Sequence, residues 1–342
     1  MKYSFKSQGN YFVITETTSN KELLRKSKAD IYFRYENERV SFYDISTDVI
    51  LPKNTGFAIA DIVDKNNNAF TDIDELLLFI SYYTGTPNKT IDFELELAEG
   101  NIPGYYAVNK FGRATDVDSI ATDIFDRANT TDNQKTHILP TQARTHTIKS
   151  TSANDTLLGT GAKTLKIYGL VDWDSKEVSE IIEMNGVTTI STQNQYVIIH
   201  RIKVLTKGSL NVSAGVITAT ADVDLTVTAQ VNVGEGQTQM AIYGIPSTQT
   251  AFVKKYYMSA IKGSTSLALE CTLLVNPEPQ NELTNFLTKN TNGIVTEGTS
   301  FLPREFNPPM KVEGPAIIKL QGDSSVANTD VSGGFDLILK DI

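Results

Sequence analysis

The sequence contains a single cysteine, Cys271, among its 342 residues. One cysteine excludes any disulfide within the chain, which fits folding in a reducing cytoplasm. Cys271 alternates with Leu269 and Leu273 in a strand-like run, and this pattern predicts a buried core thiol. Because an apolar environment raises the pKa of a thiol, we do not expect Cys271 to act as a nucleophile.

Positive charge and long apolar runs are also scarce. The chain has 31 basic and 40 acidic side chains, a net charge of −9 and a pI near 5.0. Nucleic acids and anionic membranes require a basic face, so neither is expected as a partner. No window reaches the roughly 18 apolar residues of a membrane span, and the N-terminus does not resemble a secretion signal. The sequence therefore predicts a chain made in soluble form inside a cell.

Catalytic signatures are missing as well. The three histidines are His137, His146 and His200, and they show none of the spacings of zinc or haem motifs. No GxSxG, P-loop or strand-following GxGxxG motif is present. We therefore expect no catalytic residue, no bound cofactor and no enzymatic activity.

Two pairs of aspartates offer the alternative of a glycan-degrading enzyme. Asp172 and Asp174 flank the only tryptophan, Trp173, and a second pair is formed by Asp222 and Asp224. A glycosidase needs two carboxylates about 5–10 Å apart in a cleft. Aspartates beside turns are nevertheless common in loops, so we favour the structural interpretation.

An acidic segment at residues 64–75 resembles a twelve-residue calcium loop. Oxygen donors stand at five of the ligand positions of such a loop. Ala69 occupies the position where the sharp turn normally requires glycine, and a strand precedes the segment. A turn that leads into a capped helix explains the same residues without metal, so calcium remains an alternative. The candidate ligands are Asp64, Asn66, Asn68, Asp72 and Glu75.

Residues 1–98 are predicted to form a small α+β module that docks the chain onto a larger assembly. Aromatic and β-branched residues predict three strands, and an apolar stripe predicts a helix from about Ile73 to Gly85. A last strand is expected at Thr90–Ala98. The three earlier strands are predicted at Tyr11–Glu16, Asp30–Tyr35 and Arg39–Tyr43.

The stretch from Gly100 to Ser119 separates this module from the rest of the chain. It contains three glycines, one proline and an aromatic trio formed by Tyr105, Tyr106 and Phe111. We expect an ordered crossing in place of an ordinary helix or strand, with a plain loop as the alternative. Because aromatics in a solvated linker would leave apolar surface exposed, the trio is our candidate docking interface.

The remaining chain is predicted to be β throughout. Asn185-Gly186 suits a type I′ turn and predicts a hairpin of Glu177–Met184 with Val187–Thr192. Asp224–Val233 alternates apolar and polar residues, which predicts a strand with one wet face. The segment from Pro277 to Pro315 shows less regular strand patterns.

Short strands with almost no helix indicate a mainly β fold, with one or two antiparallel β-sandwich or jelly-roll units. A possible seam at residues 234–237 divides the chain into sandwiches at 99–235 and 236–342. A single continuous sandwich is the alternative. The strands are rich in threonine and serine and poor in lysine runs, which is typical of sheet edges covered by neighbouring subunits.

Several stretches resemble a family of structural proteins of tailed-bacteriophage virions. Residues 99–342 carry this resemblance in the order of the family, and residues 11–86 look like a small module at the N-termini of other phage particle proteins. The similar stretches read GNIPGYYAVNKFGRATDVDS, GAKTLKIYGLVDW, EVSEIIEMNGVTTISTQNQYVIIHRIKVL, NVGEGQTQMAIYGIP and SGGFDLILKDI.

The resemblance implies a non-enzymatic virion protein that is synthesised in the host cytoplasm. Such proteins decorate the capsid, form head fibres, or belong to the neck or tail, and they usually assemble as homo-oligomers with other virion proteins as partners. A receptor- or glycan-binding module on the same particle is the alternative. That alternative predicts surface aromatics around Trp173, or around Tyr256 and Tyr257.

Overall fold

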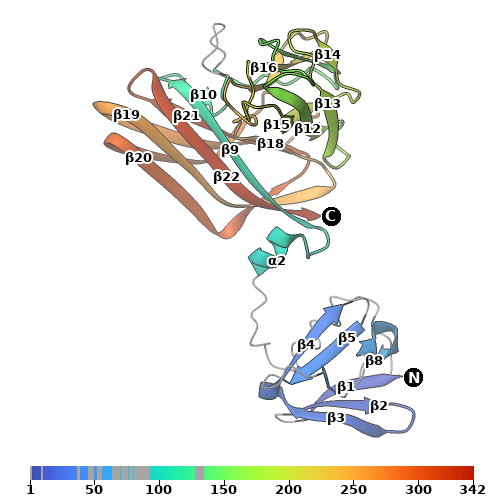
Figure 1. Cartoon of the computed structure of the whole chain (residues 1–342). Helices are drawn as coiled ribbons and strands as arrows, with labels where there is room; N and C mark the ends of the chain where they lie inside the picture. The colour runs from blue at the N-terminus through green and yellow to red at the C-terminus, as the bar shows by residue number, and fades with distance from the viewer. Residues whose placement is uncertain are drawn as a thin grey trace. The chain divides into compact units, whose positions relative to one another are not determined.

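The computed structural model describes residues 2–8, 11–36, 39–44, 50–51, 56–63, 70, 76, 80, 93–127 and 135–342. The chain divides into two compact units, Met1–Glu96 and Leu97–Ile342, each with its own core (Figure 1). Both units are built mainly from antiparallel sheets, which confirms the predicted fold class. No helix in these described ranges is both long and apolar enough to cross a membrane.

The smaller unit consists of two small sheets around an aromatic core. The rings of Phe5, Phe12 and Phe42 pack with centroid distances of 4.9–5.7 Å. The first sheet has the order β3-β2-β1-β8, and in the second sheet β5 pairs with β4, β6 and β7. The strands are β1 Tyr3–Gln8, β2 Tyr11–Glu16, β3 Lys21–Ser27, β4 Ile31–Glu36, β5 Arg39–Asp44, β6 Ile50–Leu51, β7 Phe57–Ala58 and β8 Ile62–Val63.

Helical structure in and after this unit differs in part from the prediction. Leu76 and Ile80 are helical and fully buried, four residues apart, as an apolar helix face requires; the rest of the predicted helix lies outside the described residues. The strand expected at Thr90–Ala98 is wrong, because Phe93–Glu99 forms the helix α2. Its sequence, FELELAE, has high helix propensity, with Glu94 in the first turn where the dipole favours it.

The larger unit contains a seven-stranded sheet in which two long strands, β19 (Gln249–Asn276) and β20 (Leu287–Glu313), form a ribbon. Residues 249–261 of β19 pair with β22 (Thr329–Asp341), whereas residues 269–276 pair with β21 (Ala316–Ser324). One side of β19 therefore pairs first with β22 and then with β21, and β20 pairs with its other side (Figure 1). Three strands complete this sheet: β9 Tyr105–Val117, β10 Thr122–Asp123 and β18 Ile242–Ile245.

The crossing predicted between Gly100 and Ser119 is wrong for most of its length, because β9 is an ordinary 13-residue strand. A turn at Gly104, with φ of 74°, leads into it. Gly112 does not interrupt the strand, because β9 pairs with β22 and places Gly112 opposite Gly333. The glycine is required by close approach, since a Cβ there would lie 2.2 Å from the carbonyl oxygen of Ile124.

The irregular segment expected between Pro277 and Pro315 is also mostly strand. β20 occupies 27 of its residues and pairs with β19. Its prolines, Pro303, Pro308 and Pro309, are tolerated because proline lacks only a donor that an edge strand does not need. The prolines in this segment were therefore the reason why an edge strand was not predicted there.

Two further sheets complete the larger unit. One has the order β13-β12-β15 and the other β14-β11-β16-β17. Their strands are β11 His146–Ser150, β12 Ala162–Leu170, β13 Val178–Glu183, β14 Ile190–Ser191, β15 Ile198–Lys207, β16 Ile217–Ala221 and β17 Val227–Val231.

Two predictions in this region are wrong. β13 and β14 do not form a hairpin across Asn185-Gly186, because β13 pairs with β12 and β14 pairs with β11. Gly186 instead donates to the carbonyl of Asp155, 2.8 Å away, and redirects the chain to the other sheet. The alternation at Asp224–Val233 does not give one wet face either: Thr228 and Gln230 are buried, and only β17 is strand.

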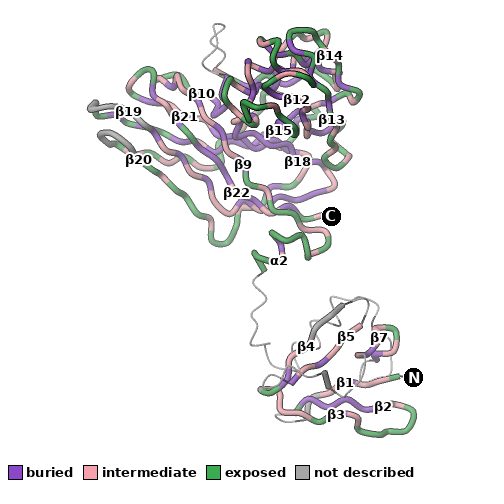
Figure 2. Tube along the Cα trace, viewed as in Figure 1, coloured by how far each residue is buried: buried purple, intermediate pink, exposed green. Residues whose placement is uncertain are grey.

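The larger unit has two hydrophobic cores that share a sheet. Neighbouring residues of β21 divide between them, since Ile317 packs into one core and Ile318 into the other. This explains why residues 316–320 are all buried (Figure 2). Cys271 is buried in the first core, which confirms its predicted place, and burial raises the pKa of its thiol. The boundary predicted at residue 235 lies between β17 and β18.

Candidate functional site

A cleft of about 520 Å³ lies beside β9 and combines buried ionisable groups with exposed aromatic and amide side chains. β9 supplies one wall with every residue from Tyr106 to Lys110. The other walls come from β12, β15, β18, β19, β22 and the segment before β13. Their lining residues are Tyr168, Lys176, Glu177, His200, Arg201, Tyr243, Gln249 and Leu339.

The most unusual group of the cleft is Lys110. The alternation of β9 places it on the buried side of the strand together with Gly112 and Ala114, and only 7% of the residue is exposed. Its Nζ donates to the carbonyl oxygen of His200, and no ion pair joins it to any carboxylate in the described part of the chain. Burial, with the nearby charge of Arg201, lowers the pKa of Lys110 to about 7.

His200 connects Lys110 to the acidic part of the cleft. Its Nε2 lies 2.5 Å from Oε2 of Glu177, and its ring stacks on Tyr243 with 4.4 Å between centroids. Burial lowers the pKa of His200 despite this carboxylate. Burial alone would raise the pKa of Glu177, but the hydrogen bond from His200 and the charges of His200, Lys110 and Arg201 bring it below its usual value. Nδ1 of His200 has no hydrogen-bond partner among the described residues.

Asp341 organises the exposed end of the cleft. Its carboxylate accepts from the hydroxyl of Tyr106 at 3.3 Å, from Nζ of Lys176 at 2.5 Å and from Nε2 of Gln249 at 2.9 Å. The Lys176 ammonium also lies 5.7 Å from the centroid of the Tyr106 ring. Tyr106 is thereby held in place although 44% of it is exposed.

The structure separates the three aromatic docking candidates. Tyr106 lines the cleft, Tyr105 lies under the ammonium of Lys340 at 5.5 Å, and Phe111 is half-buried and does not line the cleft. Their role in docking stays a prediction. Lys110 was missed, because a lone lysine between Asn109 and Phe111 indicates a solvated position; the alternation of β9 was the only signal.

The calcium candidates, from Asp64 to Glu75, lie outside the described residues. Elsewhere, within the described ranges, no group of three or more His, Cys, Asp or Glu side chains could hold a metal ion.

The aspartate pairs proposed for a glycosidase have structural partners. Asp172 accepts from the backbone N–H groups of Asp174 and Ser175 at 2.8 and 2.6 Å, as a turn-capping residue does. Asp174 accepts from the hydroxyl of Ser247 at 2.9 Å. Neither aspartate of this pair lines the cleft beside β9.

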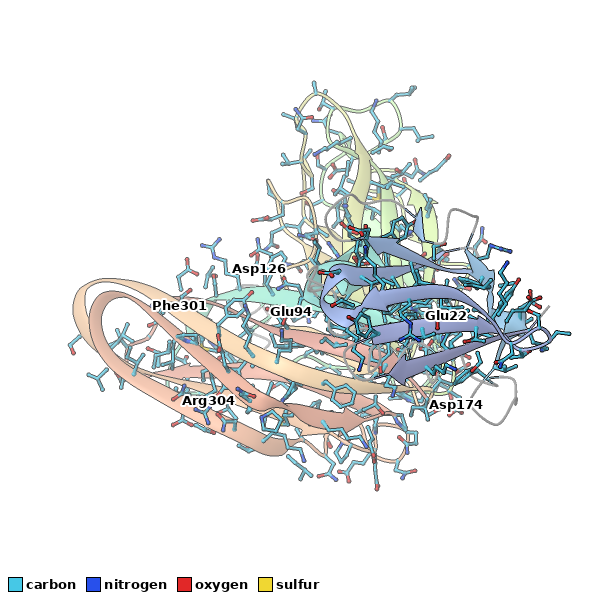
Figure 3. All side chains as sticks on the ribbon, turned by 90° about the horizontal axis from the view of Figure 1, so that it is seen from below. Glu22, Glu94, Asp126, Asp174, Phe301 and Arg304 are labelled. Carbon is cyan, nitrogen blue, oxygen red and sulfur yellow. The ribbon has the colours of Figure 1, made fainter. Side chains whose placement is uncertain are left out.

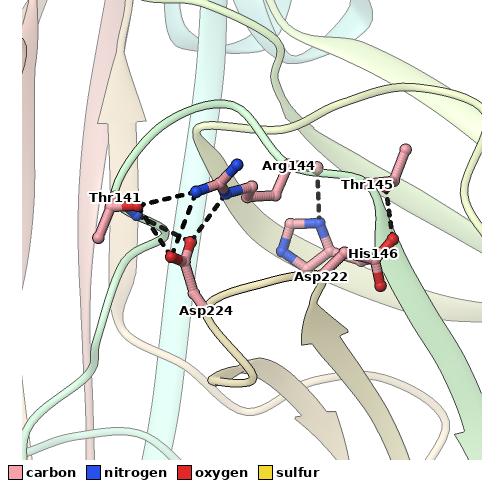
Figure 4. A network of polar contacts seen from close by, with 6 residues as sticks. All are labelled: Thr141, Arg144, Thr145, His146, Asp222 and Asp224. Atoms are coloured by element: carbon pink, nitrogen blue, oxygen red, sulfur yellow. Dashed lines mark hydrogen bonds and ion pairs between the residues drawn. The ribbon is translucent and has the colours of Figure 1, made fainter.

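The second pair belongs to a network that joins two loops (Figure 4). Asp224 lies 3.1 Å from Nε of Arg144 and also accepts from Thr141, and the hydrogen bond from Arg144 is the main reason why the pKa of Asp224 is lowered. Asp222 accepts from the hydroxyl of Thr145 at 2.5 Å. The network holds the chain before β11 against the turn between β16 and β17.

The aromatic residues suggested for a receptor-binding surface cluster differ in exposure. Tyr257 is half-buried, and its ring centroid lies 6.1 Å from that of the exposed Phe301. Tyr256 is fully buried, and its hydroxyl donates to Oδ1 of Asn290 at 2.5 Å. Trp173 is half-buried and packs against the second core. The predicted role of Tyr256 in such a cluster is therefore wrong, because the alternation of β19 turns its ring into the sandwich.

No protein-family model matches the sequence, and no curated protein matches it. Structures of infectious bursal disease virus can be aligned with the chain. The Gt strain structure is 10% identical over 73% of this chain and 78% of that chain, with a TM-score of 0.18. The Gx strain structure is 8% identical over 69% and 70%, with a TM-score of 0.17. A VP2 subviral particle of the virus is 11% identical over 69% of each chain, with a TM-score of 0.17. TM-scores of this size do not establish a common fold.

Proposed function

We propose that the chain is a non-enzymatic structural protein of a tailed-bacteriophage virion, namely a capsid decoration or head-fibre protein that works without a cofactor. In this proposal the smaller unit docks the chain onto the particle, and the larger unit contacts copies of itself. The sequence resemblance motivates the assignment to a virion. The structural observation that carries the proposal is the long outer edge of β20.

β20 pairs with β19 and with no other strand among the described residues, so its second edge is unpaired along 27 residues. An edge of this length is a template for another chain unless it is guarded. Prolines and charged residues guard the part from Glu297 to Glu313; Phe301 and Arg304 mark this part in Figure 3. The first third of the strand, from Leu287 to Val295, has no proline and Lys289 as its only charged residue.

The unguarded part of β20 also carries exposed apolar side chains. Val295 is 76% exposed on β20, which favours contact with a neighbouring subunit over permanent contact with water. Leu158, in a turn between β11 and β12, is 98% exposed and provides a matched comparison. We infer that β20 pairs with β20 or another edge of a second copy and thereby builds a homo-oligomer.

Sedimentation equilibrium of the purified chain tests this assembly. We expect a homo-oligomer for the unaltered protein and dissociation for Val295→Glu, whereas Leu158→Glu should leave the oligomer intact. Because both side chains are exposed, neither substitution should unfold the chain. A monomeric unaltered protein, or equal behaviour of the two variants, would contradict an interface at β20.

Incorporation into particles tests the docking role. Deletion of residues 1–96 should abolish incorporation while the remaining unit keeps its fold, because it has its own cores. Full incorporation of this truncated chain would contradict the docking role. Copies per virion, counted by mass spectrometry, separate the alternatives: hundreds agree with decoration, and a dozen or fewer indicate a neck or tail protein.

A further inference from the structure

Two of the positively charged side chains that line the cleft beside β9 form no ion pair with a described carboxylate. Lys110, Lys176 and Arg201 line it, and Glu177 is the one acidic residue among its described lining residues. Lys176 is paired with Asp341 and Glu177 with His200. Lys110 and Arg201 are left without a carboxylate partner in the described part of the chain.

Lys110 has donors that its surroundings do not satisfy. An ammonium group has three N–H donors, and among the described residues Nζ has one acceptor, the carbonyl oxygen of His200. A buried charge with one neutral acceptor is unfavourable, and an anion in the cleft would supply both charge and acceptors. The guanidinium of Arg201 is oriented by Gln237, whose Oε1 lies 2.6 Å from Nη2. It is therefore held in place beside the cleft.

The rest of the lining suits hydroxyl groups. The phenol of Tyr106 and the amide of Gln249 donate to Asp341, and the amide of Asn109 donates to Asp336. Their oxygen atoms are therefore the groups offered to a ligand as acceptors, and Tyr168 adds an aromatic ring. Rings of this kind pack against the C–H faces of sugars, while amides bind their hydroxyls. A cleft of about 520 Å³ lies within the usual 300–1,000 Å³ range of small-molecule sites. Its chemistry therefore points to a ligand with both a negative charge and several hydroxyls.

We propose that this cleft binds a sugar that carries a carboxylate, with Lys110 and Arg201 at the carboxylate and Tyr106 and Asn109 at its hydroxyls. Such acidic sugars occur in the polysaccharides of cell surfaces, so the site would give the protein a glycan-binding role beyond assembly. The inference rests on the cleft and not on the proposed virion role.

Proton uptake by Lys110 adds a signature of this site. Its lowered pKa, about 7, makes the charged form abundant at pH 6 and scarce at pH 8.5. The other groups that face it are Glu177, whose pKa is lowered, His200, whose pKa is lowered, and Arg201. The lowered pKa values of Glu177 and His200 move their titrations toward acidic pH, so the loss of charge from Lys110 should weaken binding as pH rises.

Isothermal titration calorimetry of the full chain with glucuronic acid tests the proposal, with glucose and inorganic phosphate as comparisons. Glucuronic acid should bind, glucose should bind at least about tenfold more weakly, and affinity should fall about tenfold or more between pH 6 and pH 8.5. Lys110→Met should lose at least about tenfold in affinity. Lys207→Met, an exposed lysine at the end of β15, should bind as the unaltered chain does.

Each contrary result overturns a defined part of the inference. No detectable binding of glucuronic acid, or equal affinity in Lys110→Met, would exclude the site. Phosphate binding as strong as glucuronic acid would reduce it to a general anion site and overturn the sugar assignment. Circular dichroism of Lys110→Met checks whether the variant is folded. Arg201→Gln, which should also weaken binding, provides a second test on a half-exposed side chain. Neither outcome of the binding experiment changes what is expected for oligomerisation or particle incorporation, so the two proposals are tested separately.

Discussion

Nζ of Lys319 lies 2.9 Å from each carboxylate oxygen of Asp123, and both residues are almost completely buried. The backbone N–H of His137 also donates to this carboxylate at 2.7 Å, and the Lys319 ammonium lies 4.1 Å from the centroid of the Phe286 ring. The pair joins β10 to β21 at the place where the two hydrophobic cores meet. It therefore joins two neighbouring strands of one sheet beside both cores.

Removal of Lys319 should be strongly destabilising. Lys319→Met leaves the carboxylate of Asp123 buried without its counter-charge, which typically costs about 3–5 kcal/mol. The double variant with Asp123→Leu should recover much of this loss, because it leaves no buried charge. Urea unfolding monitored by circular dichroism measures both values.

The exposed ion pair of Lys311 with Glu313 provides the control. Lys311→Met should leave the free energy of unfolding unchanged within error, because such surface pairs contribute little. If Lys319→Met were as mild as Lys311→Met, the buried pair would have no structural role.

A second buried carboxylate, Asp155, stabilises three loops at once. It accepts from the hydroxyl of Ser150 at 2.5 Å and from the backbone N–H groups of Ala162, Ala214 and Gly215 at 2.7–2.9 Å. Asp155→Asn converts one acceptor oxygen into a donor and leaves buried N–H groups unsatisfied, so we expect a loss of about 3 kcal/mol. Thermal unfolding should show a clear decrease in Tm.

Asp174→Asn is the matched comparison for Asp155→Asn, since Asp174 is exposed and accepts a single side-chain hydrogen bond from Ser247. Its effect should be near zero. Equal Tm values for the two variants would show that the loops do not depend on the carboxylate of Asp155.

The free energy of unfolding should decrease as pH is lowered below neutrality, because two histidines are buried. Burial lowers the pKa values of His137 and His146 to about 4, whereas both titrate near 6.5 in the unfolded chain. Between these values the unfolded state binds more protons. This contribution to stability is therefore complete above pH 6.5 and is lost as pH falls toward 4. Each histidine should account for about 1–2 kcal/mol between pH 7.5 and pH 5.

Substitution by glutamine removes one titration at a time. His137→Gln keeps a donor for the carbonyl of Thr228, which lies 2.8 Å from Nε2. The difference in unfolding free energy between pH 7.5 and pH 5 should be smaller in His137→Gln and in His146→Gln than in the unaltered chain. An unchanged pH dependence in both variants would mean that other groups determine it.

Local patterns predicted the β fold and many of its strands, because alternation is a local consequence of burial on one face. The strands predicted at Tyr11–Glu16, Asp30–Tyr35 and Arg39–Tyr43 lie within one residue of the bounds of β2, β4 and β5. The predictions fail where contacts between residues far apart in the sequence determine the secondary structure or the strand pairing. The chain after Gly186 joins another sheet because its partner is β11, and no residue near the turn indicates this. Phe93–Glu99 is helical because it has no strand partner to reward an extended conformation.

The candidate site was only partly predictable. Tyr106 was singled out as an aromatic residue in an unusual stretch, and it does line the cleft. Lys110 and His200 come from strands that are 90 residues apart, and their contact depends on how the two cores pack. Glu177 was predicted to lie in a strand, but it precedes β13 and reaches His200. Such a set of residues becomes visible only when the sheets are in place.

Gly112 provides a final test of how β9 fits between its neighbours. A Cβ at this position would lie 2.2 Å from the carbonyl oxygen of Ile124 and 2.5 Å from the backbone nitrogen of Ala241. Both are backbone atoms of packed segments, so Gly112→Ala must displace β9 or β18, and we expect a loss of about 1–3 kcal/mol or more. Gly236→Ala is the control, because no heavy atom lies within 4 Å of its added Cβ. Chemical unfolding should show a decrease for Gly112→Ala alone; since β9 also forms a wall of the cleft, the same variant should weaken the binding of glucuronic acid. Equal stability of the two variants would show that β9 can move away from Ile124 at no cost, and the tight packing inferred for this strand would then be wrong.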